Sequence, residues 1–265
     1  MSATRPYVGA SSLKALAAAA GILGVPAAAL PAVDPGVAVA PRMEFTPPRP
    51  GTYRLQKIQP AADATLLDPS GRQVRLSAVT TGKITLLTFF YTYCADPIGC
   101  PLAYRTLLDV RTGVGRIAGL EQRVRFLSVS LDPTTDTPAA IGNYREMVSH
   151  DSALEWDVLT ARSVRDLLPV LEDFGQDVSV EQAADGSARR TVHHMLKMFL
   201  IDQTGMVREI YTLAFLQPTV ILNDIQTLYL EEKPHAPRSR GPGELGSKMQ
   251  AHAPSAPHNA RNGRD

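Results

Sequence analysis

Short apolar runs alternate with segments of helical periodicity through most of this chain. Two of these runs, Ile84–Tyr91 and Val124–Leu131, have the length and composition of buried strands. A helical pattern follows each of them; the first begins near Pro101, and the second is opened by Asp136 and Pro138, which suit the start of a helix. Because strands that alternate with helices pair in parallel, the pattern predicts a parallel sheet with both faces covered.

The flanks of this pattern predict the remaining elements. Two short strands on either side of the turn sequence at 68–71 (Asp-Pro-Ser-Gly) form a hairpin before the first long strand. Further along we expect a short strand at 155–159, a helix at 163–174 that contains Pro169, a polar loop or hairpin at 176–192, strands at 195–201 and 206–211, and a closing helix at 218–230. The fold class predicted from this order is α/β, with a thioredoxin-like central sheet flanked by helices and an N-terminal β-hairpin extension.

Composition divides the chain into four parts. Residues 1–40 place basic residues before the apolar stretch Ala15–Leu30 and then small residues, the order of a signal peptide, with an N-terminal anchor as the alternative. Residues 41–62 are a proline-rich extended lead-in, residues 63–232 are the thioredoxin-like domain, and residues 233–265 are a basic tail whose composition predicts disorder. We therefore expect a periplasmic or other extracytoplasmic protein that is soluble or tethered to a membrane by its N-terminal segment.

Net charge and cysteine content narrow the functional classes. The formal net charge of +1 gives no reason to expect binding to nucleic acid. Cys94 and Cys100 are the only two cysteines, and they lie between the first long strand and the helix that follows it. In an oxidising compartment such thiols tend to pair unless they are reduced or occupied.

The position of the two cysteines favours redox chemistry or the binding of a soft metal. A helix that begins at Pro101 places the Cys100 thiol near the positive end of the helix, which lowers the pKa of a thiol. The five residues between the cysteines allow a tight loop in which the sulfur atoms meet. A purely structural disulfide, or a pair of buried thiols, is the alternative.

Two adjacent histidines are candidate ligands beside these thiols. His193 and His194 begin the expected strand at 195–201, which in a thioredoxin-like sheet lies beside the cysteine loop. Because neighbouring strand residues face opposite ways, only one of the two histidines is expected to point at the sulfurs. Two thiolates and one imidazole suit copper; zinc would need a fourth ligand, for which Asp96 is a candidate, with a loop-forming role for Asp96 as the alternative. A surface histidine is the alternative.

Four segments, in order, resemble the Sco/SenC family of copper-binding thioredoxin-like proteins. These segments are FFYTYC at 89–94, CPLA at 100–103, SVSLDPTTDTP at 128–138 and HHMLKMFLIDQTG at 193–205, and the resemblance covers about residues 50–232. It implies that Cys94, Cys100 and His194 bind copper, as Cu(I) or Cu(II), in a metallochaperone rather than an enzyme. It also implies delivery of copper to a respiratory oxidase copper centre, or reduction of that centre's thiols.

The expected partners follow from that role. They are the copper-receiving subunit of a membrane oxidase and a thioredoxin-like reductant, and we expect a monomer or a weak dimer. The chain departs from the family pattern in having five residues rather than three between its cysteines, and His193 where the family commonly has an aspartate. The longer loop costs little closure entropy but constrains the sulfurs less. Loss of the aspartate removes a hydrogen-bond partner of the imidazole.

A thiol-disulfide oxidoreductase that uses Cys94 and Cys100 is the alternative function. Enzymes of that type with a thioredoxin-like fold have a cis-proline facing the cysteines, but this chain has no proline between Pro169 and Pro218. A thioredoxin-like peroxidase and a binding module with a structural disulfide are further alternatives.

Overall fold

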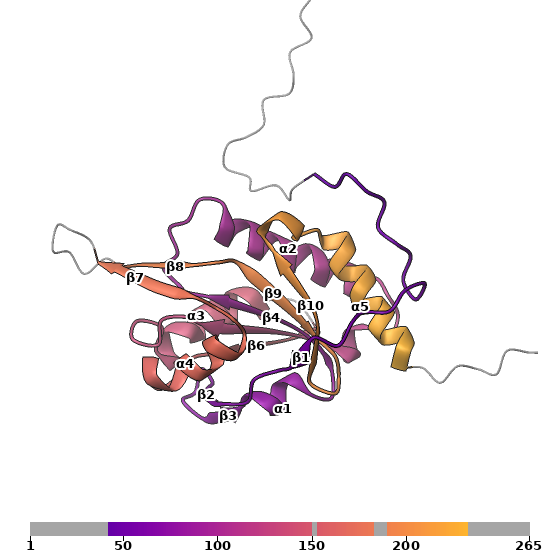
Figure 1. Ribbon diagram of the computed structural model, residues 1–265. Coiled ribbons are helices and arrows are strands. Elements are labelled where there is room, and N and C mark those ends of the chain that lie inside the picture. Colours follow the sequence, from indigo (N-terminus) through magenta and orange to yellow (C-terminus); the bar gives the residue numbers. More distant parts are fainter. Residues whose placement is uncertain (1–41, 150–152, 183–189, 233–265) are drawn as a thin grey trace, which may run out of the picture. The chain divides into compact units, whose positions relative to one another are not determined.

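The computed structural model in Figure 1 describes residues 42–149, 153–182 and 190–232. Its elements, in chain order, are β1 (Gln59–Pro60), β2 (Thr65–Leu67), β3 (Gln73–Arg75), α1 (Leu76–Thr80), β4 (Ile84–Phe90), α2 (Gly99–Gly115), η1 (Glu121–Arg123), β5 (Val124–Ser130), α3 (Pro138–Ser149), β6 (Glu155–Leu159), α4 (Val164–Asp173), β7 (Val178–Gln182), β8 (Arg190–His194), β9 (Lys197–Ile201), β10 (Met206–Thr212), η2 (Leu213–Phe215) and α5 (Pro218–Glu232). No helix in these ranges is both long and apolar enough to cross a membrane. The signal or anchor expected at 1–40 and the disordered tail expected at 233–265 lie outside the described residues.

The central sheet has six strands in the order β1-β10-β9-β4-β5-β6. Strands β4, β5 and β6 pair in parallel, and β9 pairs antiparallel with β4, so the predicted parallel core with an antiparallel addition is confirmed. β10 continues the antiparallel part, and the short strand β1, which we did not predict, forms the edge. Pro60 fits there because an edge strand tolerates a residue without a backbone N–H.

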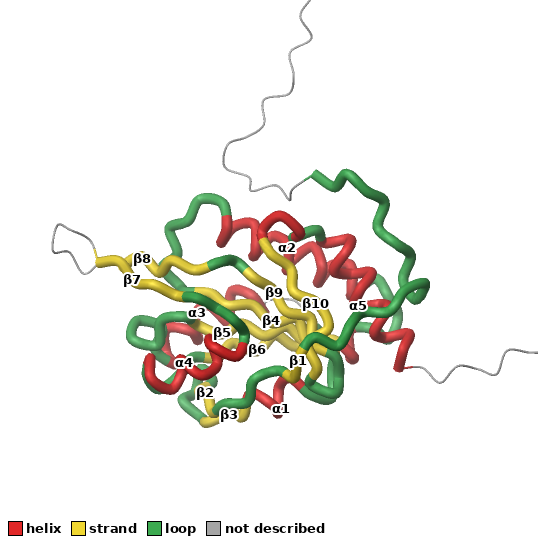
Figure 2. Tube along the Cα trace, viewed as in Figure 1, coloured by secondary structure: helices red, strands yellow, loops and turns green. Residues whose placement is uncertain are grey.

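Strand β4 is mostly apolar and buried along its whole length because both of its faces are covered. Its residues alternate between two cores: Ile84 and Leu86 pack with the helices α2, α3 and α5, whereas Leu87 and Phe89 pack with α4, α1 and the β2–β3 hairpin. Figure 2 shows helices on both sides of the sheet. This arrangement places the end of β4, and the cysteine loop that follows it, between the two helical layers.

Three local predictions need correction. The segment after β3 forms the short helix α1, which we did not predict. Helix α2 begins at Gly99, before the expected start at Pro101. The hairpin that was one expectation for 176–192 is formed by β7 and β8, but β8 continues to His194, and the strand expected at 195–201 begins only at Lys197.

Helix α4 continues through Pro169 without a break. Its first turn is capped by Ser163, whose side chain accepts a hydrogen bond from the Asp166 N–H at 3.2 Å. Pro169 is exposed, so water can replace the N–H that a proline cannot supply to the preceding turn. The buried face of α4 therefore keeps its contacts with the sheet.

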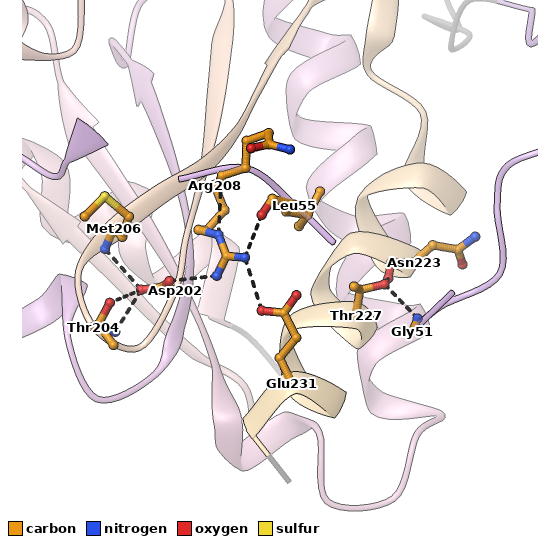
Figure 3. Close-up of polar contacts among 10 residues, drawn as sticks. Gly51, Leu55, Asp202, Thr204, Met206, Arg208, Asn223, Thr227 and Glu231 are labelled. Carbon is orange, nitrogen blue, oxygen red and sulfur yellow. Dashed lines mark hydrogen bonds and ion pairs between the residues drawn. The ribbon is translucent and has the colours of Figure 1, made fainter. Parts of the chain in front are cut away.

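The side chain of Arg208 ties the extended lead-in to the sheet and to α5 (Figure 3). Its Nη1 lies 2.9 Å from Oδ2 of Asp202, and its Nη2 donates to the Leu55 carbonyl at 2.7 Å and to Glu231 at 3.1 Å. Its Nε donates to the carbonyl of Gln56 at 3.2 Å. Because Arg208 and Asp202 are both buried, each charge depends on the other for compensation.

Asp68 organises the turn between β2 and β3, as the turn sequence predicts. Its Oδ1 accepts hydrogen bonds from the N–H groups of Ser70 at 2.9 Å and Arg72 at 3.0 Å, and its Oδ2 accepts from the Arg72 Nε at 2.9 Å. Burial alone would raise the pKa of Asp68, but the hydrogen bonds from Ser70 and Arg72 outweigh it and lower that pKa to about 2.

We predict that acid destabilises the protein partly through this turn. Because the pKa of folded Asp68 lies below the ordinary aspartate pKa of about 4, its stabilisation is complete above about pH 4 and is lost as the pH falls towards 2. Asp68→Asn should therefore flatten the pH dependence of the free energy of unfolding in that range. Urea denaturation at a series of pH values measures this, and the same slope in both proteins would contradict the assignment.

Candidate functional site

Cys94 and Cys100 form a disulfide, with their Cα atoms 6.6 Å apart. Cys94 lies in the loop after β4, and Cys100 lies in the first turn of α2, so the expected contact between the two sulfurs across a five-residue loop is confirmed. Both cysteines are half-buried. The bond is therefore accessible from the surface while it remains anchored to the core strand and to a helix.

Asp96 shapes the loop between the cysteines. Its Oδ1 accepts a hydrogen bond from the Ile98 N–H at 2.8 Å. Its Oδ2 lies so close to Gly99 that a Cβ at that position would come within 2.6 Å of it. In this disulfide-bonded form Asp96 acts as a loop-forming residue, which was the alternative to its role as a ligand.

His194 faces the cysteine loop from the end of β8. It does not begin the strand β9, as we had expected, because the chain leaves strand geometry at Met195 and Leu196. The ring of His194 is half-buried and packs edge-on against Tyr91, with ring centroids 6.1 Å apart and an interplanar angle of 76°. Burial lowers the pKa of His194, which favours the neutral imidazole that binds metals.

His193 faces the other way, as the alternation of strand residues predicts. Its side chain is exposed, and its Nε2 lies 2.9 Å from Oε2 of Glu181 on the neighbouring strand β7. The two histidines therefore have different surroundings, and His194 is the one that packs against an aromatic residue beside the disulfide.

A pocket of about 460 Å³ brings the predicted site residues together. It lies between the cysteine loop and β8, and its lining includes Cys94, Cys100, Asp96, His193 and His194. Within the described ranges, no three histidine, cysteine, aspartate or glutamate side chains are placed to hold a metal ion. In this form both sulfur atoms are already used by the disulfide.

The family model described as SCO1/SenC matches residues 56–230. The chain belongs to the SCO1/SenC family. The match covers the sheet and the helices that carry the pocket, and it confirms the resemblance seen in the four sequence segments. No curated protein is significantly similar in sequence to this chain.

Several solved Sco structures have the same thioredoxin-like fold. Apo Sco1 from Thermus thermophilus is 26% identical, with a TM-score of 0.54, and the match covers 67% of this chain and 95% of that one. Copper-bound ScoI from Bradyrhizobium japonicum is 24% identical, with a TM-score of 0.51 and coverage of 63% and 97%. BsSco, described as having a disulfide switch and as a member of the Sco family of cytochrome c oxidase assembly proteins, is 20% identical, with a TM-score of 0.50 and coverage of 66% and 98%.

Sequence reasoning missed two carboxylates that hold the cysteine loop of this SCO1/SenC protein. Asp136, fully buried, accepts hydrogen bonds from the N–H of Thr92 at 3.2 Å, from the hydroxyl of Ser130 at 2.6 Å and from the hydroxyl of Thr92. Asp132 accepts from the hydroxyl of Tyr93 at 2.5 Å. Both aspartates belong to the segment SVSLDPTTDTP, so the motif was visible in the sequence but its structural role was not.

We predict that Asp136→Ala destabilises the oxidised protein. The substitution leaves the donors on Thr92 and Ser130 without their acceptor, and an unsatisfied buried donor costs about 1–3 kcal/mol. Asp136→Asn keeps an acceptor oxygen in place and should lose less stability. Urea denaturation measures the change, with the more exposed Asp109→Ala on α2 as a control that should be close to wild type. Wild-type stability in Asp136→Ala would contradict the role assigned to this carboxylate.

Proposed function

We propose that this protein carries copper for the assembly of a respiratory oxidase and that Cys94, Cys100 and His194 hold the metal. One observation carries the proposal: the disulfide and the His194 ring line the same pocket, although they come from segments far apart in the sequence. Membership of the SCO1/SenC family supports it. So do the copper-bound structure of ScoI and the description of BsSco as a member of a family of oxidase assembly proteins.

The chemistry of the donor set fits copper once the disulfide is reduced. Two electrons and two protons convert the Cys94–Cys100 bond into two thiols, and a thioredoxin-like dithiol supplies them while it becomes a disulfide itself. Thiolates favour Cu(I), and the imidazole of His194 is a third suitable ligand. Binding then releases the thiol protons, so uptake of copper depends on both reduction and pH. The oxidation state in which the copper is delivered, Cu(I) or Cu(II), is the one that the receiving oxidase subunit accepts.

The same proposal assigns a location and a partner. The N-terminal segment predicted to direct export places the domain outside the cytoplasm, soluble or tethered, where the copper-receiving subunit of a membrane oxidase would present its own ligands. Ile98 and Met195 are exposed apolar side chains, one in the cysteine loop and one next to His194. They supply apolar surface beside the pocket that such a partner could cover.

We predict that His194→Ala weakens Cu(I) binding by the reduced protein by more than about tenfold, because even the loss of a residue that supports a ligand costs 10–100-fold in metal affinity. Competition with a coloured Cu(I) chelator measures the affinity. His193→Ala is the matched control and should bind Cu(I) as the wild type does, because the His193 side chain pairs with Glu181. Unchanged affinity in His194→Ala, or a loss confined to His193→Ala, would refute the ligand assignment.

A thiol-disulfide oxidoreductase is the second candidate, because the disulfide is half-buried and borders a pocket. Here β8 and the residues after it face the cysteines, and the sequence has no proline in that region. An incoming chain would therefore lack the backbone element that thioredoxin-type enzymes use to align it. This absence favours copper carriage over disulfide exchange.

The two candidates differ in an assay without copper. We predict that catalytic amounts of the protein do not accelerate the reduction of insulin disulfides by dithiothreitol beyond the rate seen with the Cys94→Ser/Cys100→Ser double variant. A rate close to that of thioredoxin in the same assay would instead establish the oxidoreductase.

A further inference from the structure

Gln176 lies against the ring of His194, and the proposed function assigns it no role. It lies in the turn after α4, and its own N–H donates to the Leu171 carbonyl at 2.7 Å, which closes the end of that helix. Only 4% of Gln176 is exposed. Its side chain therefore occupies one defined position between α4 and the junction of β8 and β9.

The side-chain amide of Gln176 reaches both His194 and the residue after it. Its Nε2 donates to the carbonyl oxygen of Met195 at 2.6 Å and lies 3.4 Å from Nδ1 of His194. The opposite orientation of the amide would bring two oxygen atoms into contact at that short distance, so the NH₂ group must face the Met195 carbonyl. Gln176 thus fixes this carbonyl in place.

The same carbonyl lies 3.3 Å from Nδ1 of His194. An Nδ1–H group can donate to it, and the neutral imidazole then has its lone pair on Nε2. In the other tautomer Nδ1 would accept from the Gln176 amide and the proton would be on Nε2. The first tautomer fits the contacts better, because the carbonyl can only accept and the Gln176 amide donates to that carbonyl at 2.6 Å rather than to Nδ1 at 3.4 Å.

One end of the Gln176 amide has no partner. Its Oε1 is buried and has no hydrogen-bond partner among the described residues. A buried acceptor without a partner is costly. The bond from Nε2 to the Met195 carbonyl is therefore the contact that the buried amide makes in spite of this cost.

We propose that Gln176 is a positioning residue that, through the Met195 carbonyl, holds His194 with its Nε2 lone pair available to copper. This inference rests on the proposed function. Where the family commonly has an aspartate this chain has His193, and the hydrogen-bond partner of the His194 ring is instead the Met195 carbonyl, which Gln176 holds in place. Partners of this kind orient metal-binding histidines and affect affinity 10–100-fold.

Gln176→Leu removes the amide while it keeps the approximate size of the side chain. Two-bond ¹H–¹⁵N NMR of the reduced, copper-free protein reports which nitrogen of His194 is protonated. We expect the Nδ1–H form in the wild type and a shift towards the Nε2–H form in the variant. Cu(I) competition should show a 10–100-fold loss of affinity, with Gln226→Leu on α5 as a matched control that changes neither result.

A second variant guards against a failure to fold. Gln176→Met keeps the approximate length of the side chain but lacks the N–H donor, and it should shift both measurements in the same direction. An Nε2–H tautomer in the wild type would overturn the proposal. Folded variants with an unchanged tautomer and unchanged copper affinity would also overturn it, as would a tautomer shift without a loss of affinity. Failure of the wild type to bind Cu(I) would refute the proposed function, whereas the NMR measurement decides the orienting role of Gln176 without copper.

Discussion

The buried carboxylate of Asp136 is the constraint on which the geometry of the site depends. β4 and β5 are paired in parallel to their last residues, Phe90 and Ser130, so the loops that follow them emerge side by side. Asp136, in the second of these loops, bonds the backbone and side chain of Thr92 in the first. The position of Cys94, two residues later, is therefore set by the core sheet rather than by the disulfide alone.

The other half of the site is held in a similar way from the opposite side. Gln176 follows the C-terminal end of α4, its amide fixes the Met195 carbonyl, and this carbonyl contacts the His194 ring. The pocket between the cysteine loop and β8 thus has walls that are anchored independently. Neither anchor includes a sulfur atom, so neither is broken when the sulfur–sulfur bond opens. Under the proposed function, the disulfide and copper are alternatives for the same two sulfur atoms.

The sequence was sufficient for the parts of the fold that follow from local patterns. β4 and β5 are mostly apolar runs, and the turn at Asp68 has the residues that its hydrogen bonds need, so these elements could be predicted. The helix α1 could not be predicted, because five residues after a strand carry too little periodicity.

His194 was placed at the start of the wrong strand, since pairing within the β7–β8 hairpin depends on residues distant in the sequence. Asp136 and Gln176 show their roles only in three dimensions: a single buried aspartate or glutamine has no pattern that distinguishes it from a surface residue. The assignment of His194 over His193 came from family resemblance.

The most direct test of this account is X-ray absorption at the copper edge on the reduced protein loaded with one equivalent of Cu(I). We predict a first coordination shell of two sulfur atoms and one nitrogen atom, with the outer-shell scattering of an imidazole. A shell without sulfur, or one in which the imidazole signal is absent, would contradict a copper site formed by Cys94, Cys100 and His194.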